Sequence, residues 1–196
     1  MKLIAQSLIA TALSTLALAA QAHTGHGTES LMEGLVHPFG PDHLLAMVAV
    51  GVWSVSALPA AKAWQGPATF LLALIVSATL GMLGVGVPYL EHGVALSVML
   101  FGLMLITARR PLPPALGLGL IAMAAALHGL AHGSETPDTG FAGYAIGFLI
   151  TTAALHVGGV GIGLTIQRIL AERRHVALGG LGTAVGVAGA YLFTQL

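Results

Sequence analysis

Histidine and aspartate side chains stand within apolar stretches of this chain, at spacings that suit a metal ion. The heptapeptide HPFGPDH brings His37, Asp42 and His43 close together in the sequence. Further along, His128 and His132 are four residues apart, which places them about 40° apart on one helix face. Imidazole and carboxylate groups without sulfur suit Ni²⁺, Co²⁺, Zn²⁺ or Cu²⁺. These five side chains are therefore the predicted metal-binding residues.

Two alternatives remain open for these residues. A histidine pair at this spacing also fits two side chains that hydrogen-bond neighbouring helices. Asp42 either binds the metal directly or orients His43 from outside the ligand shell.

A regular helix would not gather the residues of the heptapeptide. On an ideal helix His37 and Asp42 would point about 140° apart. Pro38 and Pro41 remove backbone N–H groups and clash with the preceding turn, so we expect the helix to break at these prolines. The break is expected to turn side chains inward, together with the His37 carbonyl freed by Pro41. A simple proline kink at the membrane surface is the alternative.

Four further histidines are candidates for a metal path. His23 and His26 precede the first long apolar segment of the mature chain, His92 opens the third such segment and His156 lies deep within the fifth. The alternatives are a disordered terminus for the first two and a hydrogen-bonded core histidine for His156.

The elements that carry these residues are membrane helices. The chain is 56% hydrophobic and only 7% charged, with a mean hydropathy of +0.91. A soluble domain carries about 25% charged residues, so this chain is predicted to be an all-α integral membrane protein. The absence of cysteine excludes disulfides and thiolate ligands. A formal net charge of zero gives no indication of a nucleic-acid partner.

The first 22 residues have the pattern of a cleaved secretory signal peptide, with an uncleaved signal anchor as the alternative. Lys2 precedes an apolar stretch, and Ala20-Gln21-Ala22 has the small-x-small pattern of a cleavage site. Residues 23–196 are predicted to form one transmembrane domain.

Six apolar segments follow the signal peptide, each near the roughly 20 residues needed to cross a bilayer. They cover residues 31–57, 68–88, 91–108, 114–132, 140–167 and 176–195. The basic residues of the mature chain fall in alternate connections, which predicts that those connections are cytoplasmic. Both mature termini are then periplasmic, as the signal peptide also requires.

Two stretches resemble the signatures of the HupE/UreJ family: HPFGPDH with Gly51 downstream, and LHGLAHGSE at residues 127–135. Four residues separate His37 from Asp42, one fewer than we expect for this family. That spacing is similar to the HxxxxDH of the wider nickel/cobalt transporter family. The resemblance implies six helices and a nickel or cobalt permease that supplies hydrogenase or urease, with His37, Asp42, His43, His128 and His132 as its motif residues.

The sequence therefore predicts a secondary permease or channel-like transporter. Its cargo is a divalent metal, with nickel favoured and cobalt or zinc as other candidates, carried across the bacterial inner membrane into the cytoplasm. No organic cofactor is expected, and no GxxxxGK phosphate-binding loop is present.

Other functional classes remain as alternatives. An intramembrane metal-dependent hydrolase would use the same His/Asp cluster with an activated water. Haem binding by helix histidines, metal sensing and metal storage are further alternatives.

Overall fold

The computed structural model describes residues 31–109, 112–135 and 141–196, and the regular elements in these ranges are all helical. This confirms the predicted helical class. The predicted signal peptide (residues 1–22), His23 and His26 lie outside the described residues.

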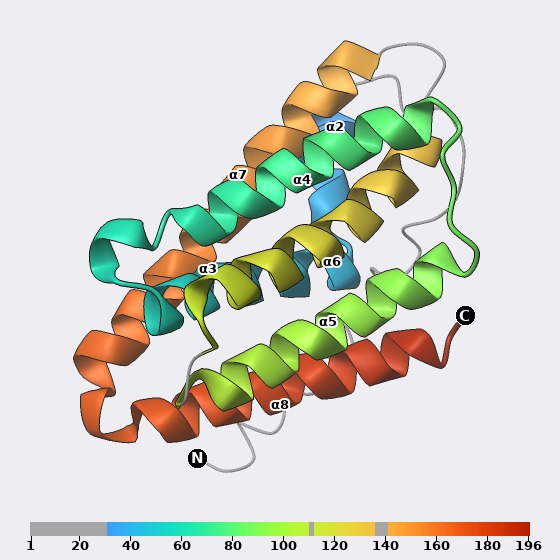
Figure 1. Cartoon of the computed structure of the whole chain (residues 1–196). Helices are drawn as coiled ribbons and strands as arrows, with labels where there is room; N and C mark the ends of the chain where they lie inside the picture. Colours follow the sequence, from blue (N-terminus) through green and yellow to red (C-terminus); the bar gives the residue numbers. More distant parts are fainter. Residues whose placement is uncertain (1–30, 110–111, 136–140) are drawn as a thin grey trace, which may run out of the picture.

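The described chain forms seven α-helices, linked in part by short 3₁₀ turns (Figure 1). The α-helices are α2 (Leu31–Val36), α3 (Pro41–Ala57), α4 (Gln65–Met82), α5 (Leu90–Ile106), α6 (Pro114–Ser134), α7 (Phe141–Ile169) and α8 (Arg174–Phe193). The 3₁₀ turns are η1 (His37–Phe39), η2 (Ala60–Lys62), η3 (Thr107–Arg109) and η4 (Ala171–Arg173).

Most of the predicted crossings are matched by helices of adequate length. Four helical segments are long and apolar enough to span a membrane: Ala60–Met82, Pro114–Ser134, Phe141–Ile169 and Ala171–Phe193. The bent pair Leu31–Phe39 and Pro41–Ala57 makes a fifth if it counts as one broken span. The apolar helix α5 is shorter, at 17 residues.

The second predicted segment, residues 68–88, is displaced in the structure. Helix α4 begins earlier, at Gln65, and ends at Met82. Gly84 adopts a positive φ of 86°, which favours glycine and ends the helix. The prediction was wrong here because apolar character continues through the exposed Val85 and Val87, beyond the point where the backbone leaves the helix.

The helices pack as close pairs: α4 on α6, α5 on α8, and both α2 and α3 on α7 (Figure 1). Glycines form these contacts. A Cβ on Gly51 would stand 2.4 Å from the His156 carbonyl oxygen, and one on Gly102 would stand 2.6 Å from the Gly182 carbonyl oxygen. Side chains at these positions would separate the helices, and the same is true at Gly147 and Gly182, where a Cβ would also meet backbone atoms.

The same packing explains the repeated His-Gly pairs of α6. Gly129 and Gly133 each follow a histidine, about 100° further around the helix. A Cβ on Gly129 would stand 2.3 Å from the Leu74 carbonyl oxygen of α4, and one on Gly133 would stand 2.1 Å from the Ala78 carbonyl oxygen. The glycines thus hold α6 against α4, while the preceding histidines point elsewhere.

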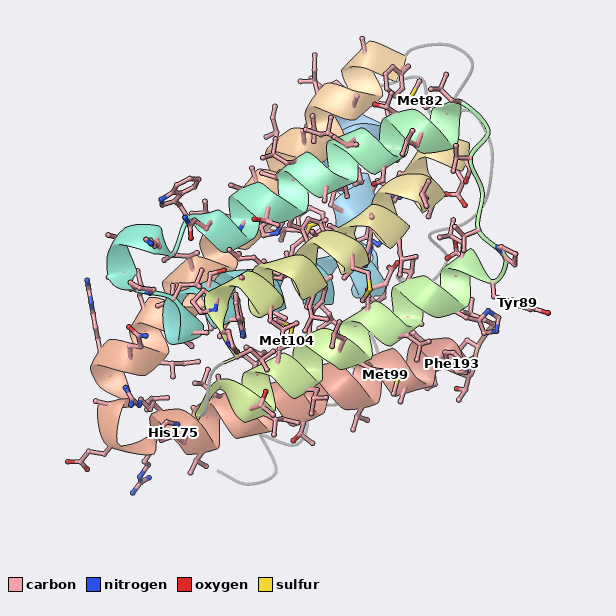
Figure 2. The ribbon with its side chains drawn as sticks, in the orientation of Figure 1. Met82, Tyr89, Met99, Met104, His175 and Phe193 are labelled. Carbon is pink, nitrogen blue, oxygen red and sulfur yellow. The ribbon has the colours of Figure 1, made fainter. Side chains whose placement is uncertain are left out.

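The connections that carry basic residues lie at one end of the bundle. The turns η2, η3 and η4 gather at the left of Figure 1, and the α4–α5 connection lies at the opposite end with the C-terminus. His175, next to Arg174, marks the first end in Figure 2, whereas Tyr89 and Phe193 mark the second. Large apolar side chains on the outer helix faces are exposed, including Leu72, Val157 and Val187. This surface is suited to lipid contact.

The glycine contacts predict unequal effects for one added methyl group on α6. Gly133→Ala should lower the free energy of unfolding of the detergent-solubilised protein by about 1–3 kcal/mol, and with it the melting temperature, because the new Cβ overlaps the backbone of α4. Gly119→Ala is the matched control on the same helix, since nothing lies within 4 Å of its added Cβ. Melting curves in which Gly133→Ala is as stable as Gly119→Ala would contradict this account of the pairing.

Candidate metal site

The site begins at the break between η1 and α3. The two helical pieces on either side of the break are bent by 73°, which confirms the predicted break at Pro38 and Pro41. Gly40 is extended, with φ −50° and ψ 139°, and Pro41 opens α3, where its missing N–H costs no helical hydrogen bond. Asp42 then lies in the first turn of α3, where the helix dipole favours a negative charge.

One detail of the prediction at this break was wrong. We expected the His37 carbonyl to be freed toward the interior, because Pro41 cannot donate to it. Instead the Gly40 N–H donates to the His37 carbonyl at 3.0 Å, which closes the 3₁₀ turn. A carbonyl left without a partner at membrane depth is costly, and the tighter turn supplies a donor one residue earlier. The site is therefore built from side chains.

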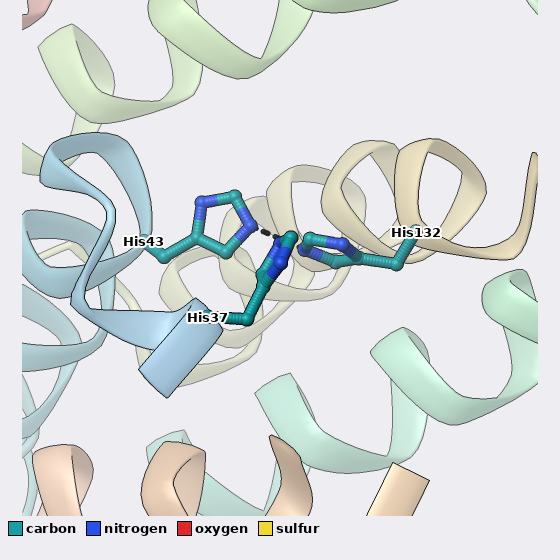
Figure 3. A group of neighbouring side chains, drawn as sticks. All are labelled: His37, His43 and His132. Atoms are coloured by element: carbon teal, nitrogen blue, oxygen red, sulfur yellow. Dashed lines mark hydrogen bonds between the residues drawn. The ribbon is translucent and has the colours of Figure 1, made fainter. Parts of the chain in front are cut away.

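Three histidines from two parts of the chain converge at the break (Figure 3). The Nε2 atoms of His43 and His132 face each other, and each of these residues is at most 6% exposed. The His37 ring lies edge-on to both, with ring centroids 4.9 Å from that of His132 and 5.6 Å from that of His43. One ring nitrogen from each histidine falls within 4.8 Å of the others, a spacing that could hold one metal ion.

A second group of possible ligands shares His43. Asp42, His43 and His128 also offer one ligand atom each, and these atoms lie within 4.8 Å of one another. The Asp42 Oδ2 lies 2.6 Å from the His43 Nδ1, and His128 is completely buried. All five predicted metal-binding residues thus belong to one of two overlapping groups.

Aromatic side chains of α7 cover this cluster. The Phe148 ring lies 4.6 Å from that of His132 and 5.8 Å from that of His37, measured between centroids. Tyr144, one turn earlier, lies 5.7 Å from His37. Both aromatic residues are less than 8% exposed, so they exclude water from one side of the cluster. Sequence reasoning missed them, although their four-residue spacing on α7 was a visible signal.

A small apolar pocket reaches the cluster from the side. It encloses about 120 Å³ between α4, α6 and α7, and His132 forms part of its wall. Leu74, Ile75 and Leu149 are among the other lining residues, and the lining includes no carboxylate. A hydrated divalent ion would find few polar partners there.

The two remaining candidates that the structure describes, His92 and His156, do not join the cluster. His92 lies at the start of α5, between the rings of Tyr89 and Phe193. The buried His156 donates from Nδ1 to the Thr152 carbonyl at 2.8 Å. This bond agrees with the alternative prediction that His156 is a hydrogen-bonded core histidine. Its Nε2 has no hydrogen-bond partner in the described part of the chain.

Two neighbours connect His128 to the rest of the bundle and were missed by sequence reasoning. The Phe70 ring of α4 contacts the rings of both His128 and His156, with centroids 5.8 Å and 4.9 Å away. The Ser97 hydroxyl of α5 lies 2.9 Å from the His128 Nε2. Neither residue is near a histidine motif in the sequence, so only the packing of the helices reveals them.

Comparison with known proteins supports the same interpretation. The family described as HupE / UreJ protein matches residues 11–192 of this chain. Protein HupE of Rhizobium leguminosarum bv. viciae is 39% identical over 190 residues, which cover 95% of this chain and 97% of that protein. No solved structure matches this chain. The predicted resemblance to this family is thus confirmed, and the chain belongs to the HupE/UreJ family of membrane metal transporters.

Proposed function

We propose that this protein is a secondary permease or channel-like transporter that carries a divalent transition metal into the bacterial cytoplasm. Nickel is the favoured cargo, and cobalt is the second candidate. The observation that carries this proposal is the presence of four buried or half-buried histidines and one aspartate in two overlapping groups within a membrane bundle. Ionisable groups are costly within a membrane and are retained where they serve a function.

The donor set fits such a cargo. Four imidazoles offer borderline nitrogen ligands, one carboxylate adds a hard oxygen ligand, and the chain has no cysteine to retain a soft ion. Asp42 contributes the negative charge that partly offsets the cost of bringing a dication out of water. Phe148 and Tyr144 then limit access to water, which strengthens the attraction between metal and ligands.

The sharing of His43 supports movement between two positions. Its Nε2 faces His132, and its Nδ1 faces Asp42. An ion bound by His37, His43 and His132 can therefore shift toward Asp42 and His128 without leaving the neighbourhood of the His43 ring. If the ligands exchange one at a time, the free-energy barrier between the two positions stays low, which conduction requires.

The order of these positions follows from the helix geometry. His132 is near the end of α6, and His128 is one turn deeper, about 6 Å along the axis. The buried His156 follows beyond Phe70, and its unpartnered Nε2 is a candidate next ligand.

The proposed orientation places the basic connections in the cytoplasm, by the positive-inside rule. The six crossings then include α5, whose 17 residues extend about 26 Å. The cluster lies toward the periplasmic half, where a mature N-terminus would bring His23 and His26, and His92 lies near the same surface. The membrane potential, negative inside, favours inward movement of a cation. The delivered metal would then be available for the assembly of hydrogenase or urease.

Substitution of individual ligands tests this proposal in cells. In cells without their own nickel uptake systems, His37→Ala, Asp42→Ala and His128→Ala should each reduce radioactive nickel accumulation by about tenfold or more. Loss of a residue that merely supports a ligand already costs about 10- to 100-fold. Cobalt and zinc added as competitors rank the cargo ions.

The matched control for these variants is His175→Ala. This histidine is exposed and accepts a hydrogen bond from its neighbour Arg174, far from the cluster, so its loss should leave uptake unchanged. Membrane expression of every variant is matched by immunoblot. Normal uptake by all three ligand variants would contradict the proposed path.

A separate variant tests whether His156 follows the cluster on the path. His156→Ala should slow nickel uptake into proteoliposomes several-fold and leave equilibrium binding at the cluster unchanged, because this residue is not among the converging ligands. Thr165→Ala is the control on the same helix, since its hydroxyl donates to the Gly161 carbonyl on an exposed face. An unchanged transport rate in His156→Ala would assign this histidine to the core.

A further inference from the structure

Ser97 is a buried residue of α5 whose hydroxyl is hydrogen-bonded to His128, the deepest histidine of the candidate metal site. It is 4% exposed, and its Oγ lies 2.9 Å from the Nε2 of His128. The same hydroxyl donates to the Val94 carbonyl at 2.7 Å. Helix α5 supplies no residue to either group of converging ligands, so this hydrogen bond is its direct link to the site.

The protons in this pair can be assigned from donor and acceptor counts. A serine hydroxyl has one proton, and here that proton is directed to the Val94 carbonyl. The Ser97 oxygen must then accept, so the Nε2–H of His128 donates to it. A neutral imidazole carries one proton, which leaves a free lone pair on the Nδ1 of His128.

The surroundings of Nδ1 agree with this assignment. This nitrogen is buried and has no hydrogen-bond partner among the described residues. The His43 ring lies on one side of His128, with centroids 5.1 Å apart, and Phe70 lies on another. One ligand atom of His128 lies within 4.8 Å of ligand atoms of Asp42 and His43, so a metal bound by these residues would be a partner for this lone pair.

We propose that Ser97 is a positioning residue that holds His128 in its Nε2–H tautomer, so that Nδ1 is the atom offered to the metal. This inference rests on the proposed function, because it assigns a role within the same site. A metal-bound histidine commonly donates its other ring N–H to a fixed acceptor, which sets the tautomer and the ring orientation. Here a serine from a third helix is that acceptor.

The tautomer can be measured without metal. Full-length protein with ¹⁵N-labelled histidine, reconstituted in lipid nanodiscs, would be examined by NMR, and His128 assigned by comparison with His128→Gln. We expect a protonated Nε2 and an unprotonated Nδ1 in the native protein. Ser97→Ala should convert this signal into a mixture of tautomers, and Ser97→Thr should restore it by returning a hydroxyl. A protonated Nδ1 in the native protein would overturn the proposal.

The same variants are then titrated with nickel. Ser97→Ala should weaken binding by about tenfold, the lower end of the range for such supporting residues. Ser97→Thr should bind more tightly than Ser97→Ala. Ser77→Ala is the matched control, because Ser77 is equally buried but its hydroxyl donates to carbonyls of its own helix. Native affinity in Ser97→Ala would overturn the role of Ser97.

The two proposals can fail separately. Absence of nickel uptake by the native protein, with the tautomer and the Ser97→Ala binding defect as expected, would refute transport and leave the role of Ser97 intact. Nickel uptake that depends on His128 but is unaffected by Ser97→Ala would refute the role of Ser97 alone.

Discussion

A divalent cation in a membrane must exchange its water shell for protein ligands, and this desolvation cost is the constraint on which the rest of the structure depends. Several donors must converge on one point, because a single imidazole cannot replace the hydration of a dication. No single regular helix can supply them from HPFGPDH. The break at Gly40 and Pro41 allows His37 and His43 to approach His132 from a neighbouring helix.

Close helix packing is the second requirement, and glycine meets it. The residues that follow the two histidines of α6 are glycines that contact α4 backbone. Gly51 and Gly159 hold α3 against α7 in the same manner. Because α7 also carries Phe148, this contact brings the aromatic cover over the histidines. In the His-Gly pairs of α6, the histidine thus supplies the candidate ligand, and the glycine that follows it sets the helix spacing.

Local geometry explains what the sequence could predict. His128 and His132 share a helix face because of the helical repeat, and the prolines predicted the break because each removes a backbone donor. The positions of the helices could be predicted from the length of the apolar segments. The exception is the end of α4, because Val85 and Val87 continue the apolar pattern beyond it. The residues of both candidate ligand groups could therefore be predicted from spacing and from motif resemblance.

Contacts between helices explain what the sequence could not predict. Ser97 and Phe70 reach the cluster from two different helices, and no sequence spacing relates them to it. The hydrogen bond from the Gly40 N–H to the His37 carbonyl forms only if the break is a 3₁₀ turn and not an open loop. The separation of His156 from the cluster depends on the register between α7 and α6. These are properties of packing, which a pattern within one helix does not encode.

X-ray absorption at the nickel edge tests most directly whether the two ligand groups form a metal site. The full chain, purified with one equivalent of nickel, should show a nitrogen and oxygen shell with the outer-shell scattering of several imidazoles. The imidazole scattering should decrease in His132→Ala and in His128→Ala. A spectrum of water and carboxylate oxygens alone, unchanged by either substitution, would contradict the site at the centre of this account.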